Sequence, residues 1–157
     1  MIHHSRMSAH MKGDFVVFLI GMRINDFWKI HRWIPVINAM GRMLKELYND
    51  KELGLLHHEM GFGRTFIIVQ YWRSMDQLIA YAKSKDSQHL PAWKEFNQKI
   101  GKDGSVGIWH ETYAVSDGNY ENIYAHMPPF GLGKAGTLEK VQGTGESAKE
   151  RLSGRWS

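Results

Sequence analysis

The chain of 157 residues contains no cysteine. Disulfides, thiolate catalysis and cysteine-ligated metals or clusters are therefore excluded. The opening stretch "MIHHSRMSAHMKGDF" has no apolar run typical of a signal peptide. No segment approaches the ~18 consecutive apolar residues that a membrane span needs. We therefore expect a cytoplasmic protein with no membrane partner.

The chain also lacks a strong excess of one charge. Twenty Lys and Arg against 16 Asp and Glu give a net charge of +4. The basic residues are scattered, whereas nucleic-acid-binding proteins usually gather them in a patch or block. No nucleic-acid partner is expected.

Aromatic residues and methionine are plentiful, with six Trp, seven Phe, six Tyr and nine Met. Such side chains build cores and also line apolar ligand pockets. The length suits one domain with a real core. We place this domain at residues 14–133, after a mobile N-terminus at 1–13 and before a polar C-terminal tail or arm at 134–157.

Hydrophobic patterning predicts a mixed α+β fold. Short runs rich in β-branched and aromatic residues predict strands, and three-to-four spacing of apolar residues predicts helices. The expected strands are 14–24, 53–63, 64–72, 105–115 and 119–127, and the expected helices are 34–50, 74–84 and 89–100. This order is a ferredoxin-like βαββαβ pattern with an added strand, which predicts an antiparallel sheet with helices on one face.

Two of these strands are apolar on both faces. The runs "VVFLIGM" and "FIIVQYW" do not alternate apolar and polar residues, as a sheet with one solvated face usually does. The second face must be covered, and no further element of the chain is left to cover it. A second copy of the sheet would do so, and we expect a homodimer.

The strand "SVGIWHETYAV" carries two neighbouring ionisable residues, His110 and Glu111. Successive side chains of a strand point to opposite faces, so this pair cannot bind one metal ion. His110 shares a face with Ile108 and Thr112. It is the candidate catalytic residue, because histidine is the commonest general acid or base; a core histidine bonded to a backbone carbonyl is the alternative.

A second histidine-rich strand, "LLHHEM", puts His57 and Glu59 on one face. Two ligands make only a weak zinc hypothesis, because the spacing offers no third ligand. "MPPFGLGKAG" lacks the strand–loop–helix context of a phosphate-binding loop.

The stretches "IIVQYWRSMDQLIAYAKS", "HLPAWKEFN", "GIWHETYAV" and "YENIYAHMPPFGLGKAG" together resemble a monooxygenase-like family that includes a fumagillin-cluster fungal member. That family belongs with the dimeric α+β barrels, as do the antibiotic-biosynthesis monooxygenases. The resemblance covers roughly residues 14–136 and implies a homodimeric ferredoxin-like barrel with a small-molecule substrate.

The same stretches are also similar to the C-terminal part of the haem-dependent aldoxime dehydratases. That resemblance implies a haem b cofactor, with His89 as the ligand of the haem iron and His110 as a distal acid or base. The two histidines are 21 residues apart. Trp93, four residues after His89, and Arg73, a possible partner of Glu111 or of a haem propionate, complete the expected cofactor site. The side chains expected to line a substrate pocket are Phe18, Phe66, Ile108 and Phe96.

Three functions remain open. The first is a haem-binding monooxygenase-like oxidoreductase or an aldoxime-dehydratase-like lyase. The second is a cofactor-independent monooxygenase of the antibiotic-biosynthesis type, in which an electron-rich substrate supplies electrons to O₂. The third is a non-enzymatic binder of haem or of another apolar ligand.

Overall fold

A computed structural model describes residues 1–84, 86–87, 89–99, 103–141 and 147–152. The side chains of Trp93 and Lys99 lie outside this description. No helix in the described ranges is long and apolar enough to cross a membrane.

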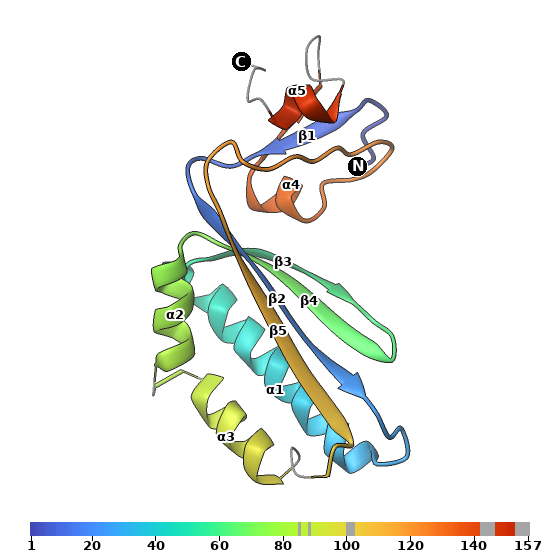
Figure 1. The fold of residues 1–157 in the computed structure, drawn as a ribbon, viewed down its shortest axis with the longest axis vertical. Coiled ribbons are helices and arrows are strands. Elements are labelled where there is room, and N and C mark those ends of the chain that lie inside the picture. The colour runs from blue at the N-terminus through green and yellow to red at the C-terminus, as the bar shows by residue number, and fades with distance from the viewer. Residues whose placement is uncertain (85, 88, 100–102, 142–146, 153–157) are drawn as a thin grey trace.

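The main sheet has four antiparallel strands in the order β3-β4-β2-β5 (Figure 1). Their bounds are β2 Phe15–Ile24, β3 Leu55–Gly61, β4 Thr65–Trp72 and β5 Val106–Val115. The first strand of the motif, β2, lies in the middle and pairs with both β4 and β5 along most of its length. This strand order and connectivity confirm the predicted ferredoxin-like α+β fold.

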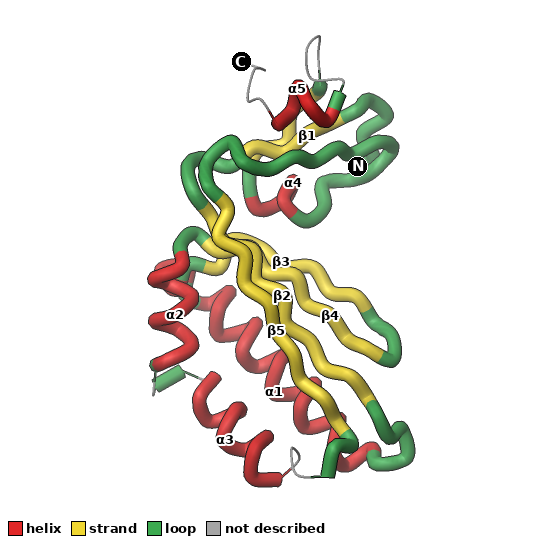
Figure 2. The backbone as a smooth tube through the Cα atoms, viewed as in Figure 1, coloured by secondary structure: helices red, strands yellow, loops and turns green. Residues whose placement is uncertain are grey.

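Three helices cover one face of this sheet (Figure 2). They are α1 Ile30–Asn49, α2 Met75–Lys83 and α3 His89–Lys99, and a short 3₁₀ turn, Lys51–Leu53, follows α1. Ser74 caps the start of α2: its hydroxyl accepts the Gln77 amide at 3.2 Å, the usual N-cap arrangement. The 3₁₀ turn ends at Gly54, where φ is +95°, a conformation that favours glycine.

The core lies between this helical layer and the sheet. Its largest cluster joins Val16, Ile68 and Trp72 of the sheet to Leu44 and Leu47 of α1 and to Leu78 and Tyr81 of α2. A second cluster joins Met22, Ile24 and Val106 to Val36 near the start of α1. Both clusters follow the three-to-four spacing of α1.

Helix α1 begins four residues earlier than predicted. A helix beginning at residue 34 would have Pro35 in its first turn; in the structure Pro35 lies inside the helix, where proline removes one backbone hydrogen bond. Hydrogen bonds to the residues that precede the helix stabilise the extra turn. The Trp33 indole donates to the Phe27 carbonyl at 3.2 Å, and the Arg32 amide donates to the Lys29 carbonyl at 2.8 Å.

A small second unit packs at one end of the sheet (Figure 1). Strand β1, Met7–His10, pairs antiparallel with β6, Thr137–Lys140. Helices α4, Leu132–Ala135, and α5, Ala148–Leu152, complete the unit. The prediction of a mobile N-terminus at 1–13 and of a polar tail or arm at 134–157 did not include this pairing, in which Ser8 and Ala9 are fully buried.

The prediction of a strand over 119–127 is wrong. This segment makes only the isolated bridges Met7–Tyr124 and His3–Met127. Side-chain hydrogen bonds replace the ladder, because Asn122 accepts the Ala9 amide at 2.6 Å and donates to the Ala9 carbonyl at 2.9 Å. An asparagine that bonds the neighbouring backbone in this way offers an alternative to sheet pairing.

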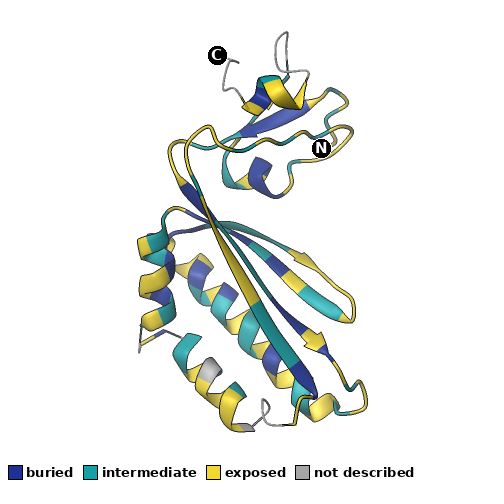
Figure 3. Ribbon diagram, viewed as in Figure 1, coloured by how far each residue is buried: buried dark blue, intermediate teal, exposed yellow. Residues whose placement is uncertain are grey.

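The other face of the main sheet is left open by α1, α2 and α3. At one end of this face the second unit packs against the sheet: Val17 and Tyr71 contact the cluster of Ala9, Phe15 and Leu132, and α4 contacts β3. The open sheet face carries the apolar side chains of Val17, Leu19, Ile67, Val69, Trp109 and Tyr113. Of these, Tyr113 is 51% exposed, and the second half of β5 is exposed along most of its length (Figure 3). The structure therefore bears out the sequence pattern of a sheet apolar on both faces.

Candidate functional site

An apolar cavity of about 340 Å³ lies between the sheet and helices α1, α2 and α3. A smaller cavity of about 40 Å³ adjoins it, deeper toward Trp72 and Tyr81, and shares several of its walls. The main cavity lies at the lower end of the range for small-molecule sites, roughly 300–1,000 Å³. It has room for one small organic molecule.

His110 lines this cavity from β5. It lies opposite Ile20 of the central strand, and its ring is 5.7 Å from the ring of Phe18. Ile108 and Thr112, its neighbours on the same strand face, line the cavity as well. The predicted alternation of β5 is therefore correct, and it puts His110 beside the cavity rather than in a closed core.

His89 lines both cavities from the first residue of α3. Its Nδ1 lies 3.0 Å from the Ala82 carbonyl oxygen, and its ring packs 6.2 Å from the ring of Tyr81. Because a carbonyl can only accept, Nδ1 must carry the hydrogen. In the neutral imidazole, Nε2 then keeps its lone pair for another partner.

Tyr81, whose ring packs against His89, is itself held in place. Tyr81 donates its hydroxyl to Glu46 Oε2 at 2.7 Å. Burial, together with this carboxylate, raises the pKa of Tyr81. Tyr81 therefore stays a neutral hydrogen-bond donor, and it ties α2 to α1 beside the cavity.

Three of the four predicted pocket residues, Phe18, Ile108 and Phe96, line the cavity. The fourth, Phe66, does not. It lies opposite Met22 on the same sheet face, but it packs into the second core cluster near the start of α1. Strand alternation predicts the face of Phe66 correctly, but the position along β4 decides which helix covers it.

The two other residues predicted for the cofactor site are Arg73 and Trp93. Arg73 follows β4, is exposed and does not line the cavity; its backbone amide donates to the Gly54 carbonyl at 2.9 Å. Glu111, its suggested partner, instead accepts the Tyr113 hydroxyl at 2.6 Å on the open sheet face. The side chain of Trp93 lies outside those that the structure describes.

Methionines of the cavity wall were missed by sequence reasoning. Met22, Met40, Met43 and Met75 all line it. The signal that could have located two of them is the spacing of Val36, Ala39, Met40 and Met43 on one face of α1. Flexible thioethers let such a wall adapt to different ligand shapes.

The cavity offers a suitable ligand for a haem iron but no partners for the haem propionates. An imidazole with a bonded Nδ1 and a free Nε2 lone pair is a suitable iron ligand, and the walls are apolar. The propionates would need cationic partners. Apart from the histidines, the only formally charged side chain among the described lining residues is Glu95, which is an anion. A haem would have to extend its propionates beyond these walls.

The predicted His57–Glu59 pair is engaged elsewhere. Glu59 Oε1 lies 2.9 Å from His57 Nε2, 3.0 Å from the Gly131 amide and 3.2 Å from Lys134 Nζ. Partial burial alone would raise the pKa of Glu59, but these donors together lower it. The carboxylate thus joins β3 to α4, and the described residues contain no group of three side chains suited to a metal ion.

Fold and cavity together define a ferredoxin-like α+β protein with a mainly apolar cavity between its sheet and its helices. The chain belongs to the family described as Monooxygenase af470-like, whose model matches residues 15–132. This range includes all four strands of the main sheet and every residue of the cavity wall.

The chain is also similar to individual proteins. It is 30% identical over 132 residues to Monooxygenase af470 of Aspergillus fumigatus, an alignment that covers 78% of this chain and 46% of that relative. The chain thus spans about half the length of the curated relative that it matches. The resemblance to aldoxime dehydratases stays a prediction.

Among solved structures, similar folds include SnoaB, a cofactor-independent oxygenase from Streptomyces nogalater, at 12% identity and a TM-score of 0.46 over 64% of this chain and 91% of that one. Rv0793 from Mycobacterium tuberculosis is 10% identical, with a TM-score of 0.48 over 65% and 96%. At these identities the likeness concerns the fold and transfers no function.

Proposed function

We propose that the protein is a monooxygenase that acts on a small, apolar organic molecule bound in the cavity. The observation that carries this proposal is that two imidazoles, His89 from α3 and His110 from β5, line one mainly apolar cavity. Membership of a monooxygenase-like family supports it. In an apolar site with a few polar groups, the walls bind the ligand and the polar groups fix its orientation.

His110 acts as the general base. It removes a proton from an electron-rich substrate, and the resulting carbanion passes electrons to O₂. One oxygen atom enters the substrate, and the other leaves as water with two hydrogens of the substrate, so that no external reductant is needed. The apolar walls hold the substrate beside His110, whose own side chain is exposed at the edge of the cavity.

His89 orients the substrate. Its Nε2 lone pair accepts a hydrogen bond from a hydroxyl group of the ligand, because its Nδ1 is bonded to the Ala82 carbonyl. A site built to bond one hydroxyl discriminates against analogues that lack it. We therefore expect phenol-like substrates, with the hydroxyl toward His89.

The test measures oxygen uptake with a panel of small electron-rich phenols. His110→Ala should lower kcat by roughly 10²- to 10⁴-fold, the usual contribution of a general base. His31→Ala is the matched control, since His31 is an exposed histidine of α1 that does not line the cavity. Unchanged turnover in His110→Ala would refute the assignment of His110.

A second candidate is haem binding at His89, as in a haem-dependent oxidoreductase or an aldoxime-dehydratase-like lyase. The observation that favours it is the bonded Nδ1 of His89, which leaves Nε2 free for a metal. Bound there, haem b would supply an iron centre for activating O₂ or an aldoxime. The chain's own contribution would be to ligate through His89 and to place His110 near the substrate.

Hemin titration separates the two candidates. The haem candidate requires a Soret band that appears on adding hemin, shifts or disappears in His89→Ala and persists in His110→Ala. A protein that turns over phenols with no Soret band supports the first candidate and excludes the second. Ligand binding without turnover of any phenol or aldoxime would favour a non-enzymatic binder.

We also propose that the protein works as a homodimer, with the two open sheet faces packed together. The apolar side chains of Leu19, Val69 and Trp109 on that face are otherwise left in contact with water. Light scattering should give twice the mass of one chain, and Leu19→Glu should give a monomer. A monomeric wild type would refute this arrangement.

A further inference from the structure

An exposed apolar surface lies at the end of the molecule where β2 runs into α1. Trp28 is 93% exposed, and Phe27, Ile30 and Ile34 are 49, 52 and 41% exposed. We call these four residues the aromatic tip. Large apolar groups gathered in one exposed place usually mark an interaction site, and the tip is separate from the open sheet face.

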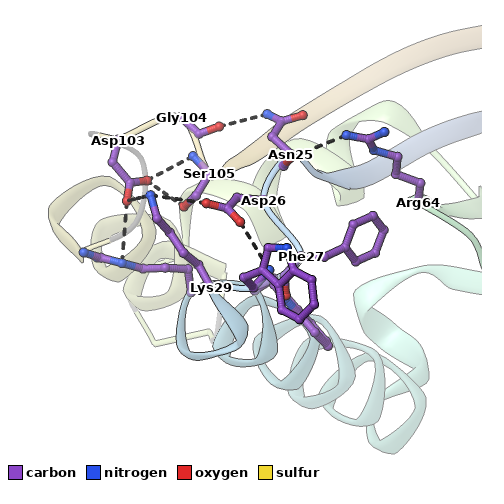
Figure 4. A network of polar contacts seen from close by, with 11 residues as sticks. Asn25, Asp26, Phe27, Lys29, Arg64, Asp103, Gly104 and Ser105 are labelled. Atoms are coloured by element: carbon purple, nitrogen blue, oxygen red, sulfur yellow. Dashed lines mark hydrogen bonds and ion pairs between the residues drawn. The ribbon is translucent and has the colours of Figure 1, made fainter.

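The loop that carries the tip is firmly braced (Figure 4). Asn25 donates its side-chain amide to the Gly104 carbonyl at 2.9 Å, and its backbone amide to the Ser105 carbonyl at 2.9 Å. Lys29 Nζ lies 3.4 Å from Asp103 Oδ2. A braced loop loses little further entropy when it binds, so an exposed tryptophan held this way is suited to docking.

A second set of contacts fixes the tip from the β3–β4 hairpin. The Arg64 guanidinium lies 5.7 Å from the ring centre of Phe27, and its Nε donates to the Ile24 carbonyl at 3.2 Å. The same hairpin exposes 73% of Phe62. Arg64 thus presents its charge next to the apolar groups.

Charge around the tip is mainly positive. Arg23, Lys29, Arg32 and Arg64 lie at this end of the molecule, while the described acidic partners of the loop are Asp26 and Asp103. Tryptophan and other large apolar residues flanked by cations are typical of protein surfaces that enter the headgroup region of a membrane. Cations near the surface are drawn to anionic lipids.

The tip also adjoins the cavity. Ile34 is followed directly by Pro35 and Val36, which line the cavity wall from α1. If the tip enters the headgroup region, this wall lies close to the lipid. An apolar substrate dissolved in the bilayer would then reach the cavity without crossing water; this route rests on the proposed function, whereas the docking itself does not.

We infer that the aromatic tip docks the protein peripherally on an anionic lipid bilayer. Trp28 and Phe27 insert among the headgroups, and Arg64, beside Phe27, faces the lipid phosphates and carboxylates. The expectation of no membrane partner considered only spanning segments, and a peripheral contact of this kind needs none.

The test is flotation of the full chain with vesicles of phosphatidylcholine alone and with about a third of phosphatidylserine added. We expect binding to the anionic vesicles and release by salt. Trp28→Ala should weaken binding by about tenfold or more, because a large apolar side chain gains that much on leaving water. Phe130→Ala is the matched control, since Phe130 is 45% exposed in the second unit and should bind as wild type.

Other outcomes overturn the inference. Wild-type protein that floats with neither vesicle refutes docking, as does Trp28→Ala that binds as well as wild type. Loss of self-association in Trp28→Ala without vesicle binding would assign the tip to a contact between copies, and capture of a protein partner without vesicle binding would assign it to that partner. Because vesicle binding needs no turnover, its failure is distinct from failure of the proposed oxygenation.

Discussion

Gly21→Ala tests how closely the strands pack behind the cavity. Gly21 is buried in the central strand β2 and lines the cavity. A Cβ at this position would lie 2.7 Å from Nε1 and 3.0 Å from Cε2 of the Trp109 indole, and it would overlap the Phe66 carbonyl oxygen. Both neighbours must shift, and one of them is backbone in the adjoining strand.

The expected cost follows from these contacts. Overpacking a closely packed site typically costs about 1–3 kcal/mol. Alanine regains roughly 0.4–1 kcal/mol, because it restricts the unfolded chain more than glycine does. Since the carbonyl of Phe66 cannot move without disturbing β4, we expect a net loss of about 1–2.5 kcal/mol in the free energy of unfolding, which corresponds to about 2–10 °C in Tm.

The assay is urea and thermal unfolding of wild type, Gly21→Ala and Gly61→Ala. Gly61 ends β3, and a Cβ there meets nothing within 4 Å, so the control should match wild type or gain a few tenths of a kcal/mol, roughly. Oligomeric state is measured alongside, because Trp109 lies on the open sheet face. A Gly21→Ala protein as stable as Gly61→Ala would refute the packing argument.

Three further predictions concern other parts of the fold. Leu47→Ala should cost about 2–5 kcal/mol in urea unfolding, because Leu47 is 2% exposed in the main core cluster; a cost near zero would contradict that packing. Glu59→Gln should lose about 1 kcal/mol at neutral pH. The pKa of Glu59 is lowered from 4.5 in the folded state, so the contribution of its carboxylate is present above that value and disappears as the pH falls through the folded pKa. Unfolding curves of both proteins should converge in acid, and a difference that grows there would contradict the sign. Ser74→Ala should cost about 1 kcal/mol by loss of the α2 cap, measured by urea unfolding and by faster amide exchange in the first turn of α2.

Elements of the main sheet and its helices could be predicted because their signal is local. The apolar run at 14–24 and the spacing in 34–50 are properties of neighbouring residues, and the structure has β2 at Phe15–Ile24 and α1 at Ile30–Asn49. The boundary of α1 was misplaced because contacts from outside the helix, such as the Trp33 indole to the Phe27 carbonyl, stabilise its first turn.

The second unit could not be predicted because its signal is not local. Each of its strands has four residues, and Ala9 pairs with Leu138 across most of the chain. Four residues carry too little periodicity to identify a strand. The polar composition of both segments predicts tails, and only their mutual pairing and the burial of Ser8 and Ala9 make them ordered strands.

The sequence by itself determined the period of each element and therefore which side chains share a face. That is why His110 and Ile108 could be put together on one side of β5, and why Glu111 could be separated from His110. Tertiary structure decided what lies opposite each face, because the position of α3 relative to β5 depends on the packing of the whole helical layer. His89 thus comes to the cavity of His110, Phe66 lies under the start of α1 instead, and Arg73 stays at the surface.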